Sequence, residues 1–410
     1  MDIEIRPVTP DEVTEVARVF GTVFGEQWPP EAIEDVRGVL EYDRSLCGFD
    51  AGTMVATGGA VTFQLALPGG TQLGAGGLTL ISVLPTHRRR GILRALIARH
   101  FEEVLGRGEP VSILLASESL LYGRFGYGLA TYAAQLAIDR RHAALRPSAT
   151  TSGRVRMLGA EEAAEVVPEL FERIRREWPG QVSRSPSFWT LWQRDPQWTR
   201  SGWDPRVVVV HEPPGGAPDG YVSYRQRGRW TDGVADGVVR VDELFAATPE
   251  ATAGLWRYCL DLDLTATVEL RDRPLDEPLR WLLVDPRRLR TTLLADFLWL
   301  RLLDLPAALR QRRYAVRGRV VFEVTDALVP ANQGRFVLEG GPDGAECGPA
   351  GRAEPDVVLD VAELGAAFLG GVRFASLARA GRVAEARPGG LARADAMFAS
   401  DPTPWCATGF

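Results

Sequence analysis

The sequence predicts an α/β protein in which one strand–helix–strand plan occurs twice, followed by a small α+β domain. A chain of 410 residues exceeds what a single hydrophobic core organises, and 45% apolar with 24% charged residues is typical of a folded globular protein. The plan lies first at 78–116 and again at 239–270. Beyond about residue 290, strand-like and helix-like runs alternate irregularly. We therefore expect two or three domains.

The first region begins with a short strand and an acidic, amphipathic helix, which we place at Ile3–Ile5 and Pro10–Val23. Met54–Leu67 has strand-like composition and ends in a Pro-Gly-Gly turn, which predicts the strands of a hairpin. Leu78–Leu84 (LTLISVL) is continuously apolar and β-branched, which is typical of a strand buried on both faces.

A helix and a second strand follow this run. Apolar residues recur at the spacing of one helix face: Leu93, Leu96, Ile97, Phe101, Val104 and Leu105. Gly106 and Gly108 end the helix, and Val111–Ala116 (VSILLA) predicts a second buried strand. The order is therefore strand, arginine-rich turn, helix, strand.

The second copy keeps the order of elements and loses the arginine-rich turn. We expect a strand at Val239–Ala246, a helix at Thr248–Leu262 and a strand at Leu264–Leu270. Where the first copy has LPTHRRRGI, the second has ATPEATAGL, with a possible helix cap at Thr248 and an acid at Glu250. This turn would repel a phosphate.

The C-terminal part reads as a small α+β domain. We expect helices at Leu293–Leu303, Pro306–Arg313, Val361–Phe368 and Leu391–Ala399, and strands at Ala315–Val324 and Arg335–Glu339. The last stretch, WCATGF, is too apolar for a free tail, so we expect the terminus to be docked.

Composition excludes several classes of protein. A net charge of −6 argues against a general nucleic-acid binder. Four dispersed cysteines and four histidines argue against a zinc site or a disulfide framework. The start shows no secretory signal, and charged residues interrupt the most apolar stretch, Thr292–Leu309. We expect a cytoplasmic protein without metal, membrane or nucleic-acid partners.

The segment HRRRGIL, from His87 to Leu93, is the strongest local signal of binding. It joins a buried strand to a helix start, where free backbone N–H groups and the helix dipole favour an anion. Gly91 permits close approach, and the arginines add forked donors. A solvated basic turn is the alternative, but its position favours a pyrophosphate site.

Two strings carry a family resemblance: SVLPTHRRRGILRAL from Ser82 to Leu96, and ASESLLYGRFGY from Ala116 to Tyr127. They resemble the GNAT superfamily of acetyltransferases and, within it, the Eis (enhanced intracellular survival) family. The resemblance implies an active GNAT domain at 1–145, a degenerate one at 146–290 and a sterol-carrier-protein-like domain at 291–410. Each GNAT domain would have a mixed central sheet with splayed strands.

The resemblance also implies acetyl-CoA as co-substrate, with no metal. The pyrophosphate loop of the family corresponds to Arg88-x-x-Gly91-x-Leu93, where Leu93 departs from the general GNAT pattern. The main chain of the first splayed strand would hold the pantetheine arm, and the Val83 N–H would polarise the thioester carbonyl. The implied cofactor-binding residues are Ile81, Ser82, Val83, Arg88, Arg89, Gly91, Ile92, Leu93, Ser117 and Glu118.

Two residues take catalytic roles by resemblance. Tyr122 stands at the place of the general acid, since a phenol keeps its proton at neutral pH and can donate it to the departing thiolate. A tyrosine packed over nearby glycines is the alternative, and Tyr127 is the neighbour to exclude. The α-carboxylate of Phe410 is the candidate base. Gly409 replaces an acidic residue found in some family members, which lowers the expected affinity for polycations.

The implied acceptor is a primary amine on a polycationic small molecule, such as an aminoglycoside antibiotic. Glu26 and Trp28 are candidates to line its cleft, although solvated surface and domain packing also explain them. The resemblance further implies a homohexamer. Two other functions stay open: acetylation of protein lysine, and a non-catalytic carrier or regulatory role that uses the C-terminal domain for an apolar ligand.

Overall fold

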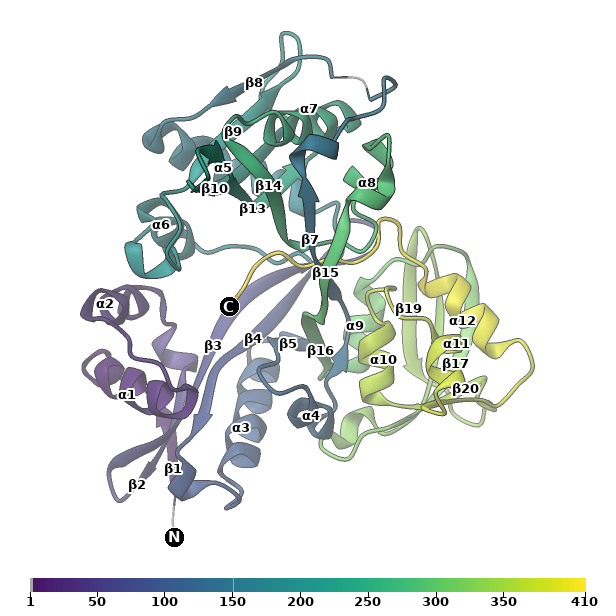
Figure 1. Cartoon of the computed structure of the whole chain (residues 1–410). Helices are drawn as coiled ribbons and strands as arrows, with labels where there is room; N and C mark the ends of the chain where they lie inside the picture. Colours follow the sequence, from purple (N-terminus) through teal and green to yellow (C-terminus); the bar gives the residue numbers. More distant parts are fainter. Residues whose placement is uncertain (1–2, 150) are drawn as a thin grey trace. The chain divides into compact units, whose positions relative to one another are not determined.

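The computed structural model describes residues 3–149 and 151–410 and divides into two compact units (Figure 1). Each unit is assembled from separated stretches: the first from the chain up to Thr131, Asp296–Pro404 and Thr408–Phe410, and the second from Tyr132–Ala295 and Trp405–Ala407. The domain limits predicted from the sequence, 145/146 and 290/291, follow the family resemblance rather than spatial compactness, and they stay a prediction. Within the described residues, no helix combines the length and apolar composition that a bilayer crossing requires.

The first unit is organised around a sheet in which β4 and β5 run parallel. In spatial order its strands are β1 (Ile3–Pro7), β2 (Leu46–Asp50), β3 (Thr53–Ala66), β4 (Gln72–Val83), β5 (Val111–Leu115), β16 (Leu298–Leu302) and β6 (Gly128–Leu129). β3 and β4 form the predicted hairpin. β4, helix α3 (Ile92–Gly106) and β5 form the predicted strand–helix–strand unit.

Helices α1 and α3 cover opposite faces of this sheet. α1 (Val13–Phe24) packs its buried valines against Cys47 and Phe49 of β2, whereas α3 packs Ile92 and Leu96 against Leu46. Successive side chains of a strand point to opposite faces, so Leu46 and Cys47 mark the two faces. α2 (Pro30–Val39) lies beside α1, and the short α4 (Ser119–Tyr122) follows β5 (Figure 1).

The second unit repeats the plan, as the sequence predicts. Its sheet has the order β15 (Arg290–Asp296), β7 (Tyr132–Asp139), β14 (Thr265–Arg273), β13 (Gly237–Ala246), β10 (Gly220–Arg227), β9 (Val207–Glu212) and β8 (Arg154–Met157). β13 and β14 are parallel and are joined by α7 (Pro249–Leu260). The Thr248 hydroxyl caps α7 by accepting a hydrogen bond from the Ala251 N–H at 3.1 Å. The unit also contains α5 (Ala160–Arg175), α6 (Pro186–Arg194), α8 (Leu279–Leu282) and a small hairpin of β11 (Trp230–Thr231) and β12 (Val234–Ala235).

The C-terminal part of the first unit is the predicted α+β domain. Its sheet has the order β19 (Gly344–Pro349), β18 (Gly334–Gly341), β17 (Gly318–Thr325), β20 (Val357–Asp360) and β21 (Val383–Glu385). Its helices are α9 (Leu305–Gln311), α10 (Val361–Ala367), α11 (Phe374–Arg379) and α12 (Gly390–Phe398). Four of these elements overlap the predicted ones closely: α9, β18, α10 and α12. The C-terminal stretch is docked as expected, because Trp405, Cys406 and Thr408 are buried.

The predicted helix at Leu293–Leu303 is wrong, because this run forms two strands, β15 and β16. β16 pairs with β5 on one side and β6 on the other, so its main chain is satisfied by sheet hydrogen bonds. A short apolar run satisfies the patterns of a buried helix and of a buried strand equally well. Tertiary pairing therefore decided the conformation.

Two burial predictions also need correction. Leu78–Leu84 is not buried on both faces, since Thr79, Leu80, Ile81 and Val83 keep partial exposure. In α3, Leu105 is 39% exposed and does not continue the buried stripe. The half-exposed end of β4 is where the site described below opens.

The buried histidine of α3 generates a prediction about acid stability. His100 Nε2 lies 2.8 Å from the Ser112 hydroxyl, which lies 2.7 Å from the Tyr127 hydroxyl. Burial lowers the pKa of His100 to about 3. An unfolded histidine titrates near pH 6.5, so below that pH the unfolded chain binds a proton that the folded chain does not. The contribution of His100 is thus complete above about pH 6.5 and is lost as the pH falls towards 3.

We expect protonation of His100 in the unfolded chain to lower the free energy of unfolding by about 2 kcal/mol between pH 6.5 and pH 5. The limiting slope is about 1.4 kcal/mol for each pH unit. Urea unfolding of the wild type and of His100→Gln at both pH values measures it. The variant should be less stable at neutral pH and lose less on acidification. Equal losses in the two proteins would contradict the assignment.

Candidate functional site

The site begins where the parallel pairing of β4 and β5 stops. The last paired residues are Leu78 and Leu114, but β4 continues to Val83. A bulge lies opposite Gly58, between the pairs Thr57–Ser82 and Gly59–Thr79, and Leu80 there has a φ of 51°. The two strands therefore separate, and the free side of β4 faces an open wedge.

Hydrogen bonds from β3 hold the bulge in place. The Thr57 hydroxyl lies 2.6 Å from the Leu80 carbonyl oxygen and 2.6 Å from the Ser82 hydroxyl. Ser82 is 3% exposed, so its side chain is committed to β3 rather than to a ligand. The Ser82 hydroxyl is therefore not the group that β4 offers to a ligand.

The register of β3 and β4 determines which main-chain groups point into the wedge. The Leu84 N–H donates to the Val55 carbonyl oxygen at 2.9 Å, so these residues form a hydrogen-bonded pair. Pairs alternate along an antiparallel ladder, which makes Val83 and Ala56 a non-hydrogen-bonded pair. The N–H and C=O of Val83 consequently point away from β3. The Val83 carbonyl accepts a hydrogen bond from Arg88 Nε at 3.3 Å, which agrees with this direction.

The arginine-rich turn connects this strand end to the start of α3. Arg89 and Gly91 have φ angles of 62° and 83°, and Gly91 is the N-cap residue of the helix. Two left-handed residues so close together turn the chain sharply, and glycine adopts this conformation without steric cost. The first N–H groups of α3 and the positive end of its dipole are thereby brought to the wedge. A helix start of this kind favours an anion, so the geometry is compatible with the predicted pyrophosphate site, which stays a prediction.

A cavity of about 790 Å³ occupies the wedge and the turn. It is lined by the backbone and side chains of Val23, Phe24, Ile81, Ser82, Val83, His87, Arg88, Arg89, Gly91, Ile92, Leu93, Arg94, Ser117, Glu118, Leu121, Tyr122, Arg124, Phe125, Ala327 and Leu328. All ten predicted cofactor residues are in this set. Four arginines face one glutamate, so the cavity is strongly positive, and its volume suits a cofactor.

Tyr122 also lines this cavity, at the end of α4. Its ring is 4% exposed and meets the Tyr127 ring edge to face, with 6.0 Å between centroids. Burial raises the pKa of Tyr122 to about 12, an effect that the Ser117 hydrogen bond partly opposes and the charge of Glu118 reinforces. The phenol is therefore protonated throughout the physiological range.

Tyr127 has a different environment. It is fully buried, its hydroxyl is bonded to Ser112, and it does not line the cavity. Of the two tyrosines in the YGRFGY segment, only Tyr122 borders the positive cavity.

The remaining predicted site residues lie outside the cavity lining. The Phe410 ring packs against Phe63 of β3 with 4.7 Å between centroids, and the chain end lies beside β3 (Figure 1). Glu26 is exposed at the surface. Trp28 packs on Phe20 at 5.4 Å, and Phe20 stacks at 4.2 Å on Phe24, which does line the cavity. Trp28 is therefore connected to the site through an aromatic row.

Sequence reasoning missed several lining residues. Arg94 and Arg124 could have been found, since they belong to the same arginine-rich strings. Ala327 and Leu328 could not, because they come from the C-terminal domain and carry no motif. Asp326 fixes their loop by accepting hydrogen bonds from the Leu328 and Val329 N–H groups, at 3.1 and 3.0 Å, and from Arg301 at 2.7 Å.

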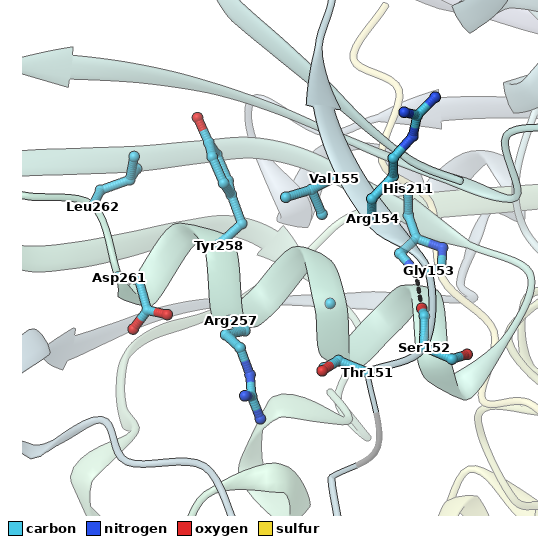
Figure 2. A pocket seen from close by; sticks show the side chains of 11 residues that line it. Thr151, Ser152, Gly153, Arg154, Val155, His211, Arg257, Tyr258, Asp261 and Leu262 are labelled. Atoms are coloured by element: carbon cyan, nitrogen blue, oxygen red, sulfur yellow. Dashed lines mark hydrogen bonds between the residues drawn. The ribbon is translucent and has the colours of Figure 1, made fainter. Parts of the chain in front are cut away.

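A second cavity, of about 410 Å³, lies in the second unit between residues 151–155 and α7 (Figure 2). His211 is the residue there that could act as a base. Its Nε2 lies 2.7 Å from the Ser152 carbonyl oxygen, the contact drawn in Figure 2, and its Nδ1 lies 2.6 Å from Asp219. Both ring nitrogens are committed to structural contacts. The cavity is also lined by Tyr258, whose hydroxyl lies 2.8 Å from the Tyr224 hydroxyl.

The part of the chain that the structure describes contains no cluster of side chains that could coordinate a metal ion. No group of three His, Cys, Asp or Glu side chains is placed to hold an ion within residues 3–149 and 151–410. The cysteines Cys47, Cys259, Cys347 and Cys406 are all buried and form no disulfide within the described residues.

Family models match three consecutive parts of the chain. Residues 4–130 and 180–302 match two models that are each described as an acetyltransferase (GNAT) domain, and residues 305–407 match a sterol carrier protein domain. The fold class predicted from the sequence, two GNAT folds and a sterol-carrier-like domain, is confirmed.

Whole-chain comparisons agree. The chain is 39% identical over 398 residues to an uncharacterised N-acetyltransferase of Streptomyces coelicolor, covering 96% of this chain and 95% of the relative. It is 37% identical over 342 residues to the N-acetyltransferase Eis of Mycobacterium bovis, covering 82% and 81%. The crystal structure of Eis1 from Mycobacterium abscessus superposes with a TM-score of 0.87 at 37% identity, covering 99% of this chain and 100% of that one. The chain therefore belongs to the Eis family of GNAT N-acetyltransferases.

Proposed function

We propose that this acetyltransferase transfers the acetyl group of acetyl-CoA to primary amines of polycationic small molecules, such as aminoglycosides, by direct attack in a ternary complex. GNAT membership implies acetyl-CoA as the acyl donor. The observation that carries the proposal is the protonated phenol of Tyr122 inside a positive cavity at the splayed end of β4.

The donor would be held by main chain and by arginines. The diphosphate of CoA suits the start of α3, where free N–H groups meet Arg88 and Arg89. The pantetheine arm would run along Ile81–Val83. The Val83 N–H, which points away from β3, would donate to the thioester oxygen as charge develops on it. Ile92, Leu93, Ser117 and Glu118 complete the wall.

The reaction is a single displacement. The neutral amine nitrogen attacks the thioester carbon, the C–N bond forms, and the C–S bond breaks with its electron pair on sulfur. Tyr122 donates its proton to that sulfur and regains one from solvent. The raised pKa of Tyr122 does not oppose this transfer, because a thiolate formed in the same buried cavity is also destabilised by desolvation.

The amine must lose a proton during the reaction, and the α-carboxylate of Phe410 is our candidate to accept it. What supports this role is that Phe410 is held rather than free: its ring packs on Phe63 and lies close to Gly77 of β4. Glu26 and Trp28 remain candidates for the acceptor cleft, and the homohexamer remains a prediction. Acetylation of protein lysine is the rival acceptor class, and a carrier role for the C-terminal domain is the rival function.

The acceptor class is tested with purified protein, acetyl-CoA, a panel of aminoglycosides and polyamines, and lysine-containing peptides. Thiol release followed with a colorimetric reagent should be fastest with aminoglycosides and slow with the peptides. Faster turnover on peptides would assign the protein to the lysine acetyltransferases. Absence of release with every amine, together with no binding of CoA, would leave the carrier role.

Replacing Tyr122 by Phe should lower kcat by about 10²-fold, because the departing thiolate loses its proton donor while the ring still fills its place. The KM for acetyl-CoA should stay within about twofold. In the wild type, Tyr122 should cause no loss of kcat near pH 10, where a free phenol would ionise, because its pKa is about 12. Initial rates from pH 7 to pH 10.5 test both points, with Tyr127→Phe as the matched control for a lost phenol outside the cavity. An unchanged kcat in Tyr122→Phe would remove this residue from the mechanism.

The double substitution Arg88→Ala with Arg89→Ala should act on donor binding. Loss of charged hydrogen bonds to the diphosphate should raise the dissociation constant of CoA about tenfold or more. Calorimetric titration with CoA measures this directly, and pantetheine, which lacks the diphosphate, should bind both proteins alike. Arg99→Ala, an exposed arginine farther along α3, is the control and should bind CoA as the wild type does. Unchanged affinity in the double variant would contradict the placement of the diphosphate.

A further inference from the structure

The second copy of the GNAT plan contains the same wedge as the first. Parallel pairing of β13 and β14 ends at Val241 and Leu270, and β13 then continues to Ala246. In the first copy, pairing ends at Leu78 and Leu114, and β4 continues to Val83. In both copies the strand has a bulge directly after this point. In the second copy, the bulge of β13 lies opposite the step from Ser223 to Tyr224 of the neighbouring strand β10. Leu244–Ala246 is therefore the counterpart of Ile81–Val83.

The wedge of the second copy is filled by a side chain from the end of the sequence. Its walls include Leu244, Phe245 and Ala246 of β13, Arg273 at the end of β14, and Glu277 and Pro278 beyond it. Trp405 lies among them. The space that remains measures about 20 Å³, against about 790 Å³ in the first copy. About one water molecule fits such a space, and a cofactor arm does not.

Trp405 is fixed on every side of its ring. It is 2% exposed and stacks on Phe245, with 5.0 Å between centroids and 27° between planes. Trp178 meets it edge to face at 5.5 Å, and the Arg273 guanidinium lies 4.8 Å from the ring centre. The indole N–H donates to the Asp272 carbonyl, and the backbone N–H donates to the Pro179 carbonyl at 2.8 Å.

This anchor limits where the chain terminus can go. Trp405–Ala407 belongs to the second unit and Thr408–Phe410 to the first. A fully extended chain spans at most about 3.6 Å per residue, so Phe410 lies within about 18 Å of the Trp405 Cα atom. Because Trp405 is buried and contacted by Phe245, Trp178 and Arg273, only the five residues after it separate the α-carboxylate from this anchor.

We propose that the second GNAT copy has exchanged cofactor binding for retention of the chain's own C-terminal segment, with Trp405 as the resident of its cofactor slot. Trp405 is then a positioning residue, which acts through the Phe410 carboxylate that accepts the amine proton. This last step rests on the proposed function, whereas occupation of the slot does not. Absence of the arginine turn and the acid Glu250 at the start of α7 agree with a slot that holds no diphosphate.

The first arm of the test measures how many CoA molecules bind to each chain. Calorimetric titration of the wild type with CoA should give one site per chain, and two sites per chain would overturn the proposal for the slot. The second arm needs no activity: carboxypeptidase should release Phe410 slowly from the wild type and at least about tenfold faster from Trp405→Ala, because an unanchored tail is accessible. Equal release from both would overturn the anchor.

The third arm is kinetic. Trp405→Ala should keep the KM for acetyl-CoA within about twofold and lose about 10-fold to 100-fold in kcat, since a misplaced base costs turnover rather than donor affinity. Its pH–rate profile should match that of the chain lacking Phe410. Trp405→Phe, which keeps the stack on Phe245, should fall between, and added indole should restore part of the rate in Trp405→Ala. Trp230→Ala, at an exposed position of the same unit, is the control for loss of a tryptophan.

The outcomes separate the two proposals. A wild type that releases no thiol with any amine contradicts the proposed function, while ligand counting and carboxypeptidase still judge the slot and the anchor. A wild type that is active, with Trp405→Ala equal to it in kcat and in pH profile, contradicts the positioning role. If Trp405→Ala does not fold, Trp405→Phe decides by the same comparison.

Discussion

The structure depends on a single interruption of β pairing. After Leu78 and Leu114, β4 and β5 no longer share hydrogen bonds, and the bulge held by Thr57 turns the end of β4 away from its former partner. This end of β4 is half-exposed, so its free backbone groups can be satisfied by water or by a ligand. An interruption of this kind turns sheet main chain into a ligand-binding surface without using any side chain. The arginine turn and Tyr122 are then placed at the two ends of that surface.

The same kind of interruption occurs in both copies of the GNAT plan, and the two wedges differ in what fills them. In the first copy the wedge is open and bordered by arginines, whereas in the second it is closed by an indole from the C-terminal segment. A planar aromatic side chain is a suitable occupant, because Trp405 stacks on Phe245 and its N–H satisfies the Asp272 carbonyl. Loss of the turn removes affinity for a diphosphate, and the indole removes the space for its arm. Under the proposal above, both features act against cofactor binding in this copy.

Local patterns predicted much of this, and long-range pairing explains what they missed. The strand–helix–strand units and the anion turn were predictable, because turn chemistry and helical spacing act over a few residues. The strand β16 was not, since Leu298–Leu302 is a strand only because β5 and β6 flank it. Partial exposure of Thr79, Leu80, Ile81 and Val83 was missed for a related reason: an apolar run does not reveal that its parallel partner ends early. The roles of Leu328 and Trp405 depend on contacts across hundreds of residues, which no local pattern encodes.

The C-terminal domain contributes to the wall of the positive cavity through Ala327 and Leu328. Asp326 bonds the N–H groups of its own loop and the guanidinium of Arg301, which is buried in β16 beside β5. Arg301 packs so closely on Gly126 that any side chain there would collide with it. One buried ion pair thus joins the loop that carries Leu328 to the segment that follows Tyr122. A displacement of the C-terminal domain would therefore move a wall of the cavity and the backbone next to the Tyr122 phenol together. Under the proposed function, the domain would thereby constrain the geometry of acetyl transfer.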